Sequence, residues 1–432
     1  MKYFEKANHL LPFLAYNTDY QEAKMKITNL PKKTWQKIYD FQILFCLLAE
    51  VLLMVSGLHN ATKTKNQVTA IILLVLFLAL TVYVQKMKVK DKFTYEFTRW
   101  LNLLFGPGIL CTFWLKIGNL LLVHLPQIEI IWVLLLWAVL LGLLLPIAMV
   151  YAAQIKNWFL RLLIVFLLNI QYGLVNTLKV SRSLKIMHSL TGQGVIAAIS
   201  LFILACFLGK AWGFRFNPNL KFNKSQNFQQ VTFVLLILFT LLDLFYNCFN
   251  AYSKDIWTVF FRYDFNNLKF SLPNLTCAIE PGILEETVRY LNIIILLAGF
   301  NHLPKWRVPI AIYGSTLLFG LAHLGNVGWH GATLSATIMQ AIGVTGCGFL
   351  WAVLYLYTGK LWPAIVAHFI SDFVANMLTG WNSAGWHWHG YATDYIYTIL
   401  IVGVPLLFSI WMMFGKARQV MEENADRIMN VN

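Results

Sequence analysis

The chain has 432 residues, of which 58% are hydrophobic and only 12% are charged, and its formal net charge is +15. Soluble globular proteins carry about 45–50% apolar and about 25% charged residues. This composition excludes a soluble globular protein and indicates a protein of the lipid bilayer. The positive charge does not indicate nucleic-acid binding, because the Lys and Arg residues lie in short loops between apolar runs, where such residues orient membrane proteins.

Long apolar runs occur along the whole chain. A helix needs roughly 20 apolar residues to cross a hydrocarbon core about 30 Å thick. The sequence therefore predicts an all-α polytopic membrane protein with about twelve transmembrane helices, within a range of about 10–13. The predicted spans cover residues 40–58, 68–85, 100–115, 128–153, 158–177, 194–212, 231–249, 281–300, 308–324, 333–357, 361–379 and 395–414. The third run is short and contains Pro107 and Gly108, so a kinked or re-entrant segment is expected there.

Basic residues are more frequent in the loops on the side of the N-terminus, which predicts that both termini are cytoplasmic. The polar stretch 251–280, which holds Cys277 in an expected loop, divides the chain into two regions. Residues 1–250 form an N-terminal membrane region of about seven spans without an assigned role. Residues 251–432 form a C-terminal core of about five spans followed by a short cytoplasmic helix.

The C-terminal core concentrates ionisable residues inside apolar runs. They are Glu285, Glu286 and Arg289 in GILEETVRY, His323 in FGLAH, and His368 and Asp372 in AHFISD. Each such residue costs about 2.5–3.5 kcal/mol at the centre of a membrane helix, so a cluster of them indicates a functional site.

Helical geometry predicts that these residues meet. His368 and Asp372 are four residues apart and share one helix face, as do Glu285 and Arg289. Glu285 is near the start of its span and His323 near the end of the next, so both approach the same membrane face. We expect one pocket that opens toward this face, with Gly343, Gly346 and Gly348 allowing close helix approach.

A carboxylate beside imidazoles suits the activation of water, with the carboxylate as general base or with a metal ion. The sequence contains no HExxH motif, no Gly-x-Ser-Gly serine site and no Gly-x-Gly-Asp aspartyl motif. None of the six cysteines forms CxxC. The set of Glu and His residues is therefore the candidate site.

The order of these motifs resembles the CAAX-protease and bacteriocin-processing (CPBP) family. Glu285-Glu286 is followed shortly by Arg289, then by Phe319-x-x-x-His323 and His368-x-x-x-Asp372. The resemblance covers roughly residues 275–380. It implies an intramembrane endopeptidase, related to type II CAAX prenyl endopeptidases, that hydrolyses a membrane-associated, lipidated or secreted peptide or protein. It also implies the plasma membrane of a bacterium and, for some relatives, bacteriocin processing.

By this resemblance, Glu285 and His323 activate water, while His368 and Asp372 stabilise the oxyanion or help to hold a metal. The corresponding metal site would be zinc bound by Glu285, His323, His368 and Asp372. The supporting residues are Arg289, Phe319 and Asn376. The first motif departs from the family pattern, because two residues rather than three separate Glu286 from Arg289 and Tyr290 stands at the usual Arg position. Whether Glu285 or Glu286 faces the site stays open; Glu285 is preferred as the first of the pair.

Two other functions stay open. Many spans with buried acids also suit a membrane transporter, although no internal repeat is present. The same fold could instead serve a non-proteolytic binding or immunity protein. The glutamate pair could also form only a structural ion pair with Arg289.

Overall fold

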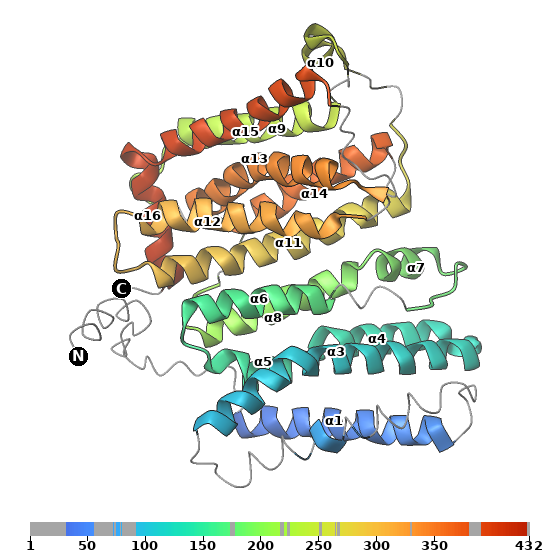
Figure 1. Cartoon of the computed structure of the whole chain (residues 1–432). Coiled ribbons are helices and arrows are strands. Elements are labelled where there is room, and N and C mark those ends of the chain that lie inside the picture. The colour runs from blue at the N-terminus through green and yellow to red at the C-terminus, as the bar shows by residue number, and fades with distance from the viewer. Residues whose placement is uncertain are drawn as a thin grey trace, which may run out of the picture.

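The structure is a computed structural model of the chain. It describes residues 32–55, 72, 75–77, 79, 92–172, 178–216, 220–222, 225–249, 253–263, 265, 268–328, 331–379 and 390–429. These residues form helices that run roughly side by side in stacked tiers (Figure 1) and, within these ranges, no strand. The predicted all-α membrane fold is confirmed.

The lower tiers of Figure 1 hold the N-terminal region. Its helices are α1 (Lys32–Val55), α3 (Lys92–His124), η4 (Pro126–Ile128), α4 (Glu129–Gly142), α5 (Leu145–Val150), η5 (Ala152–Gln154), α6 (Trp158–Tyr172), α7 (Lys185–Gly192), α8 (Val195–Ala211) and α9 (Gln230–Phe249). Of these, α9 lies apart from the others, beside α15 in the uppermost tier. The predicted span 68–85 lies largely outside the described residues.

The upper tiers hold the C-terminal core. Its helices are α10 (Ile256–Phe261), α11 (Leu272–Gly299), α12 (Arg307–Ala322), η7 (His323–Asn326), α13 (Leu334–Thr358), α14 (Trp362–Thr379), α15 (Ala392–Met412) and α16 (Gly415–Met429). Thus the predicted C-terminal helix is present as α16, which crosses the ends of the core helices (Figure 1).

Six described helices are long and apolar enough to cross a membrane, or seven if α7 and α8, bent by 55°, form one broken span. Two shorter apolar helices lie at Trp158–Ile170 and Trp362–Leu378. The central helix α11 is not among these apolar helices, because it carries several charged residues in its middle. A count of twelve spans therefore stays a prediction.

Two local expectations differ from the structure. The run containing Pro107 is not a short re-entrant segment, since Pro107 lies inside α3, a continuous helix of 33 residues; a kink at this proline stays a prediction. The stretch holding Cys277 is not a loop, because α11 begins at Leu272 rather than near residue 281. The side chain of Ser271 caps α11 by accepting a hydrogen bond from the Asn274 backbone N–H at 3.1 Å, and Pro273 lies in the first turn.

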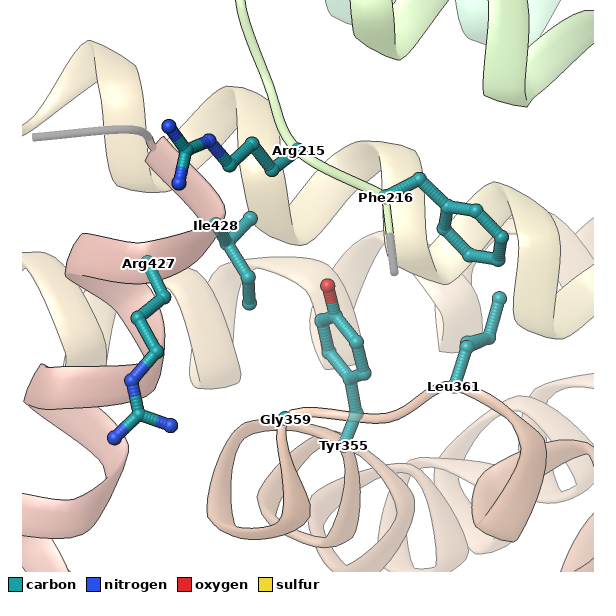
Figure 2. A pocket seen from close by; sticks show the side chains of 7 residues that line it. All are labelled: Arg215, Phe216, Tyr355, Gly359, Leu361, Arg427 and Ile428. Carbon is teal, nitrogen blue, oxygen red and sulfur yellow. The ribbon is translucent and has the colours of Figure 1, made fainter. Parts of the chain in front are cut away.

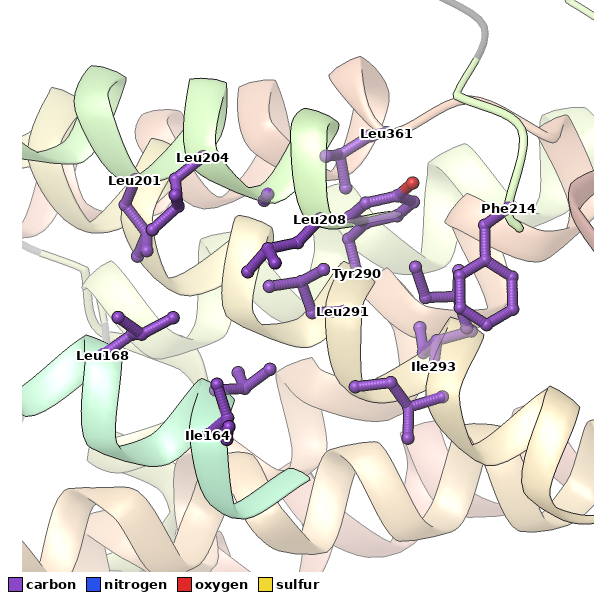
Figure 3. Packing of buried hydrophobic residues seen from close by; sticks show 14 of the residues in the cluster. Ile164, Leu168, Leu201, Leu204, Leu208, Phe214, Tyr290, Leu291, Ile293 and Leu361 are labelled. Atoms are coloured by element: carbon purple, nitrogen blue, oxygen red, sulfur yellow. The ribbon is translucent and has the colours of Figure 1, made fainter. Parts of the chain in front are cut away.

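Helix α11 lies between the two regions and packs against α6 and α8 on one side and α12 and α14 on the other (Figure 1). Figure 3 shows leucines of α8 and aliphatic residues of α6 packed against Tyr290, Leu291 and Ile293 of α11. Ile293 is fully buried in this cluster. Because lipid is itself apolar, such contacts stabilise a membrane protein mainly through close van der Waals packing.

Two of the glycines on α13 lie at close helix contacts, as the sequence predicts. A Cβ atom added to Gly346 would lie 2.1 Å from the backbone oxygen of Ile401 on α15. A Cβ atom added to Gly348 would lie 2.8 Å from Thr316 on α12 and 2.9 Å from the Arg289 guanidinium on α11. Any larger residue would push α13 away from these helices.

Candidate active site

The candidate site forms beside a close contact between α11 and α14. Gly282 lies about one turn before Glu285, and a Cβ atom at this glycine would be 3.2 Å from the backbone nitrogen of Phe369 and 3.3 Å from the backbone oxygen of Ile365. The absence of a side chain lets the two backbones come together. As a consequence, His368 on α14 lies beside the glutamates of α11.

Four of the predicted residues converge from three helices. Glu285 Oε2 lies 3.9 Å from His323 Nε2 and 3.7 Å from His368 Nε2. His368 Nε2 also lies 3.5 Å from Asp372 Oδ2, one turn further along α14. The side chain of Glu285 is 30% exposed, whereas that of His368 is 5% exposed. The carboxylate thus faces open space at the edge of a buried imidazole.

Glu286 has a different environment from its neighbour. Its side chain is fully buried, and Arg289 Nε donates to its two oxygens at 3.1 and 2.9 Å. His368 Nδ1 lies 3.0 Å from Glu286 Oε1. Since an ionised carboxylate only accepts hydrogen bonds, this nitrogen is the donor. Arg289 therefore pairs with Glu286, and Glu286 in turn orients His368.

Aromatic side chains contact two of the buried site residues. The Arg289 guanidinium carbon lies 3.8 Å from the centre of the Phe319 ring, a cation–π contact in a buried setting. The ring of Trp351 on α13 stacks on His368, with the ring centres 4.2 Å apart and an angle of 24° between the planes. These contacts leave His368 little freedom to rotate.

The orientation of His323 follows from its own helix turn. Its Nδ1 lies 3.0 Å from the backbone oxygen of Phe319, and a carbonyl oxygen can only accept. The proton of neutral His323 is therefore assigned to Nδ1 by this bond. Its Nε2, which faces Glu285, then carries a free lone pair.

The remaining predicted residue, Asn376, is engaged elsewhere. Its side-chain amide donates to the backbone oxygen of Asn274 at 3.4 Å, near the start of α11. Two residues near the site had no role in the sequence prediction. Trp351 carries no local signal in the sequence. Glu280 precedes Glu285 by five residues on α11 and interacts electrostatically with Glu285 and Asp372. The predicted span begins at residue 281, directly after Glu280, and so the prediction did not include this residue.

A cavity of about 190 Å³ opens beside the converging residues. Glu285 and His323 line it, together with residues of α6, α11 and α12. A second cavity, of about 160 Å³, lies where α13 and α16 end (Figure 2), and its lining includes Arg215, Tyr355 and Arg427. Its lining residues include none of the predicted site residues.

A zinc ion at this site would require a particular arrangement of ligands. Structural and catalytic zinc sites use at least three protein ligands that converge on one point. Among the residues that the structure describes, no three His, Cys, Asp or Glu side chains form such a group.

Comparison with known proteins matches the part of the chain that holds this site. Residues 270–374, about a quarter of the chain, match the family described as Type II CAAX prenyl endopeptidase Rce1-like. Neither the curated proteins nor the solved structures contain a match to this chain. The matched segment includes α11, α12 and α13 and extends into α14 to residue 374, so it contains Asp372. This match supports CPBP family membership for this segment and, in general, an intramembrane protease of the CAAX type.

Proposed function

We propose that the protein is an intramembrane endopeptidase in which Glu285 and His323 activate a water molecule. The observation that carries this proposal is the convergence of Glu285, His323 and His368 from three helices, with Glu285 facing the cavity. Carboxylates and imidazoles in this arrangement suit general acid–base catalysis. The family match supports the same reaction class.

The spacing of the two groups suits one water between them. Glu285 Oε2 and His323 Nε2 are 3.9 Å apart, which is too far for a direct hydrogen bond but within reach of a shared water. Such a water donates one proton toward the carboxylate and the other toward the free lone pair of Nε2. Its oxygen lone pairs are then available for attack.

In the first step, Glu285 takes a proton from the water, and the water oxygen forms a bond to the carbonyl carbon of the substrate. The carbonyl oxygen becomes an oxyanion. His368, with Nδ1 donating to Glu286, donates from Nε2 to this oxyanion in its protonated form, and Asp372 stabilises the positive charge at Nε2. Preorganised donors of this kind are worth about 3–4 kcal/mol in acyl transfer.

In the second step, the carbon–nitrogen bond breaks and Glu285 returns its proton to the leaving amine. The products are a carboxylic acid and an amine, so atoms and charges balance. Glu286, Arg289 and Phe319 touch no reacting atom in this scheme. They act as positioning residues for His368 and His323.

The substrate in this proposal is a membrane-associated peptide or protein, lipidated or secreted. Support comes from the family description, which names prenyl endopeptidases, and from the location of the site inside a helical membrane bundle. A bacterial plasma membrane, with both termini in the cytoplasm, is the proposed location.

The test replaces Glu285 with Gln, which removes the base but keeps the shape. Purified protein in liposomes should cleave a prenylated, internally quenched CAAX peptide, and Glu285→Gln should lower kcat by about 10²–10⁴. Glu96→Gln is the matched control, because the exposed fraction of its side chain, 34%, is close to the 30% of Glu285. Retained cleavage by Glu285→Gln would disprove the mechanism, and a transport defect without any cleavage product would favour a carrier.

A further inference from the structure

Asn169 on α6 brings the N-terminal region to the candidate active site. It lines the same cavity as Glu285 and His323, although it lies about 100 residues before the segment that matches the family. Its side-chain Oδ1 is buried and accepts no hydrogen bond within the described part of the protein. A buried acceptor without a partner is unusual in proteins and indicates a missing donor.

A second amide faces the same space from α11. Asn292 lines the cavity and is only 7% exposed. Much of the rest of the lining is apolar, with Leu284, Val288 and Leu318 among its residues. In such surroundings hydrogen bonds are stronger than in water, so a ligand with matching polar groups is favoured.

The chemistry of two asparagines defines what they can bind. Each side chain has one acceptor and two donor hydrogens, the complement of a peptide group with its N–H and C=O. The cavity, about 190 Å³, is larger than the engineered cavity of about 150 Å³ that holds benzene. It therefore has room for one peptide group and the side chain beside it.

The position of Asn292 along α11 sets its distance from Glu285. Glu285, Val288, Arg289 and Asn292 all line the cavity and follow the spacing of a single helix face. At 1.5 Å per residue, Asn292 lies about 10 Å along the helix from Glu285. An extended peptide covers this distance with about three residues.

We propose that Asn169 and Asn292 bind a backbone peptide group of the substrate, about three residues from the bond that is cleaved. Asn169 Oδ1 accepts the substrate N–H, and an amide N–H of Asn292 donates to the substrate carbonyl. The N-terminal region thus supplies one wall of the substrate site. This inference rests on the proposed endopeptidase function and assigns to it a substrate-binding residue outside the matched family segment.

The first experiment separates binding from chemistry. Asn169→Ala should raise KM for the quenched prenylated peptide about three- to tenfold and change kcat less than twofold, because one neutral hydrogen bond is lost before the chemical step. Ile170→Ala is the matched control, since Ile170 is the next residue on α6 and is 50% exposed on another face. Asn169→Ser is made in parallel, and the thermal unfolding of every variant is compared with that of the wild type.

The second experiment tests the contact itself. In a series of depsipeptide substrates, an ester replaces one peptide group at a time and removes its N–H. An ester at one position, about three residues from the cleaved bond, should raise the KM of the wild type. With this substrate, Asn169→Ala should cause no further increase in KM. Equal effects of Asn169→Ala on every ester substrate, or an unchanged KM in folded Asn169→Ala and Asn292→Ala variants, would overturn the inference.

A binding measurement distinguishes the two proposals. Peptide binding by the Glu285→Gln variant is measured with and without Asn169→Ala. If the wild type cleaves nothing but Asn169→Ala still weakens binding, the proposed reaction fails and the binding site holds. If Glu285→Gln abolishes cleavage but Asn169→Ala leaves both binding and KM unchanged, the reaction holds and the binding site fails.

Discussion

His368 donates a hydrogen bond from Nδ1 to the Glu286 carboxylate at 3.0 Å, while its other ring nitrogen faces Glu285 at 3.7 Å. One imidazole thus contacts both members of the glutamate pair, and the two glutamates have different roles. Glu286 is buried against Arg289 and orients the ring, whereas Glu285 faces the cavity. Each glutamate therefore has its own expected phenotype on substitution.

Replacing Glu286 with Gln should destabilise the protein more than it changes the chemistry. The substitution leaves the Arg289 guanidinium buried without its counterion, and breaking a buried pair in this way costs about 3–5 kcal/mol. Thermal unfolding of the purified protein in detergent should show a clear decrease in Tm. Glu285→Gln should unfold at the wild-type temperature. Equal Tm values for both variants would contradict the role of Glu286 as the buried counterion of Arg289.

Replacing Arg289 with Lys keeps the charge but should still impair the site. A lysine ammonium lacks the planar group that stacks 3.8 Å from the Phe319 ring centre and also donates to Glu286. We expect a lower Tm together with a lower kcat, since both Glu286 and His368 lose their orientation. The check is kcat measured well below the Tm of the variant. A wild-type kcat there would show that Arg289 does not position the reacting groups.

Asp372→Asn distinguishes a metal-free site from a zinc site. In the metal-free scheme the amide can still orient His368 from 3.5 Å, so much of the activity should remain. A zinc site that uses Asp372 as ligand would lose nearly all activity, because an amide is a poor replacement for a carboxylate ligand. Metal content and activity after exhaustive chelation are measured in parallel. Stoichiometric zinc, with activity lost on its removal and restored on its return, would refute the metal-free scheme.

Gly282→Val tests whether the close approach of α11 and α14 sets the geometry of the site. The added side chain would meet the backbone of α14 at Phe369 and Ile365 and push His368 away from Glu285. A displacement of about 1 Å can cost about 100-fold in rate, so kcat should fall strongly. Gly142→Val is the matched control, because a Cβ atom there meets nothing within 4 Å. Similar kcat values for the two variants would exclude this role of Gly282.

The class of fold and the positions of most helices could be predicted from the amino-acid sequence alone. Apolar runs of about 20 residues can satisfy their backbone in lipid only as helices, so α13 begins and ends within one residue of its predicted bounds. Helix starts marked by polar residues were harder to predict. The start of α11 at Leu272 depends on the Ser271 cap and on contacts with α14, which an apolar window does not detect.

The environment of each site residue depends on how the helices pack, and it could not be predicted from the sequence. Glu285 and Glu286 are neighbours on one helix, and a rotation of about 100° between them puts one against the cavity and the other against Arg289. The sequence left this choice open because it depends on which helices pack on which side of α11. Asn169 is part of the cavity for the same reason: α6 packs on α11 across more than 100 residues of chain, and no local pattern encodes that contact.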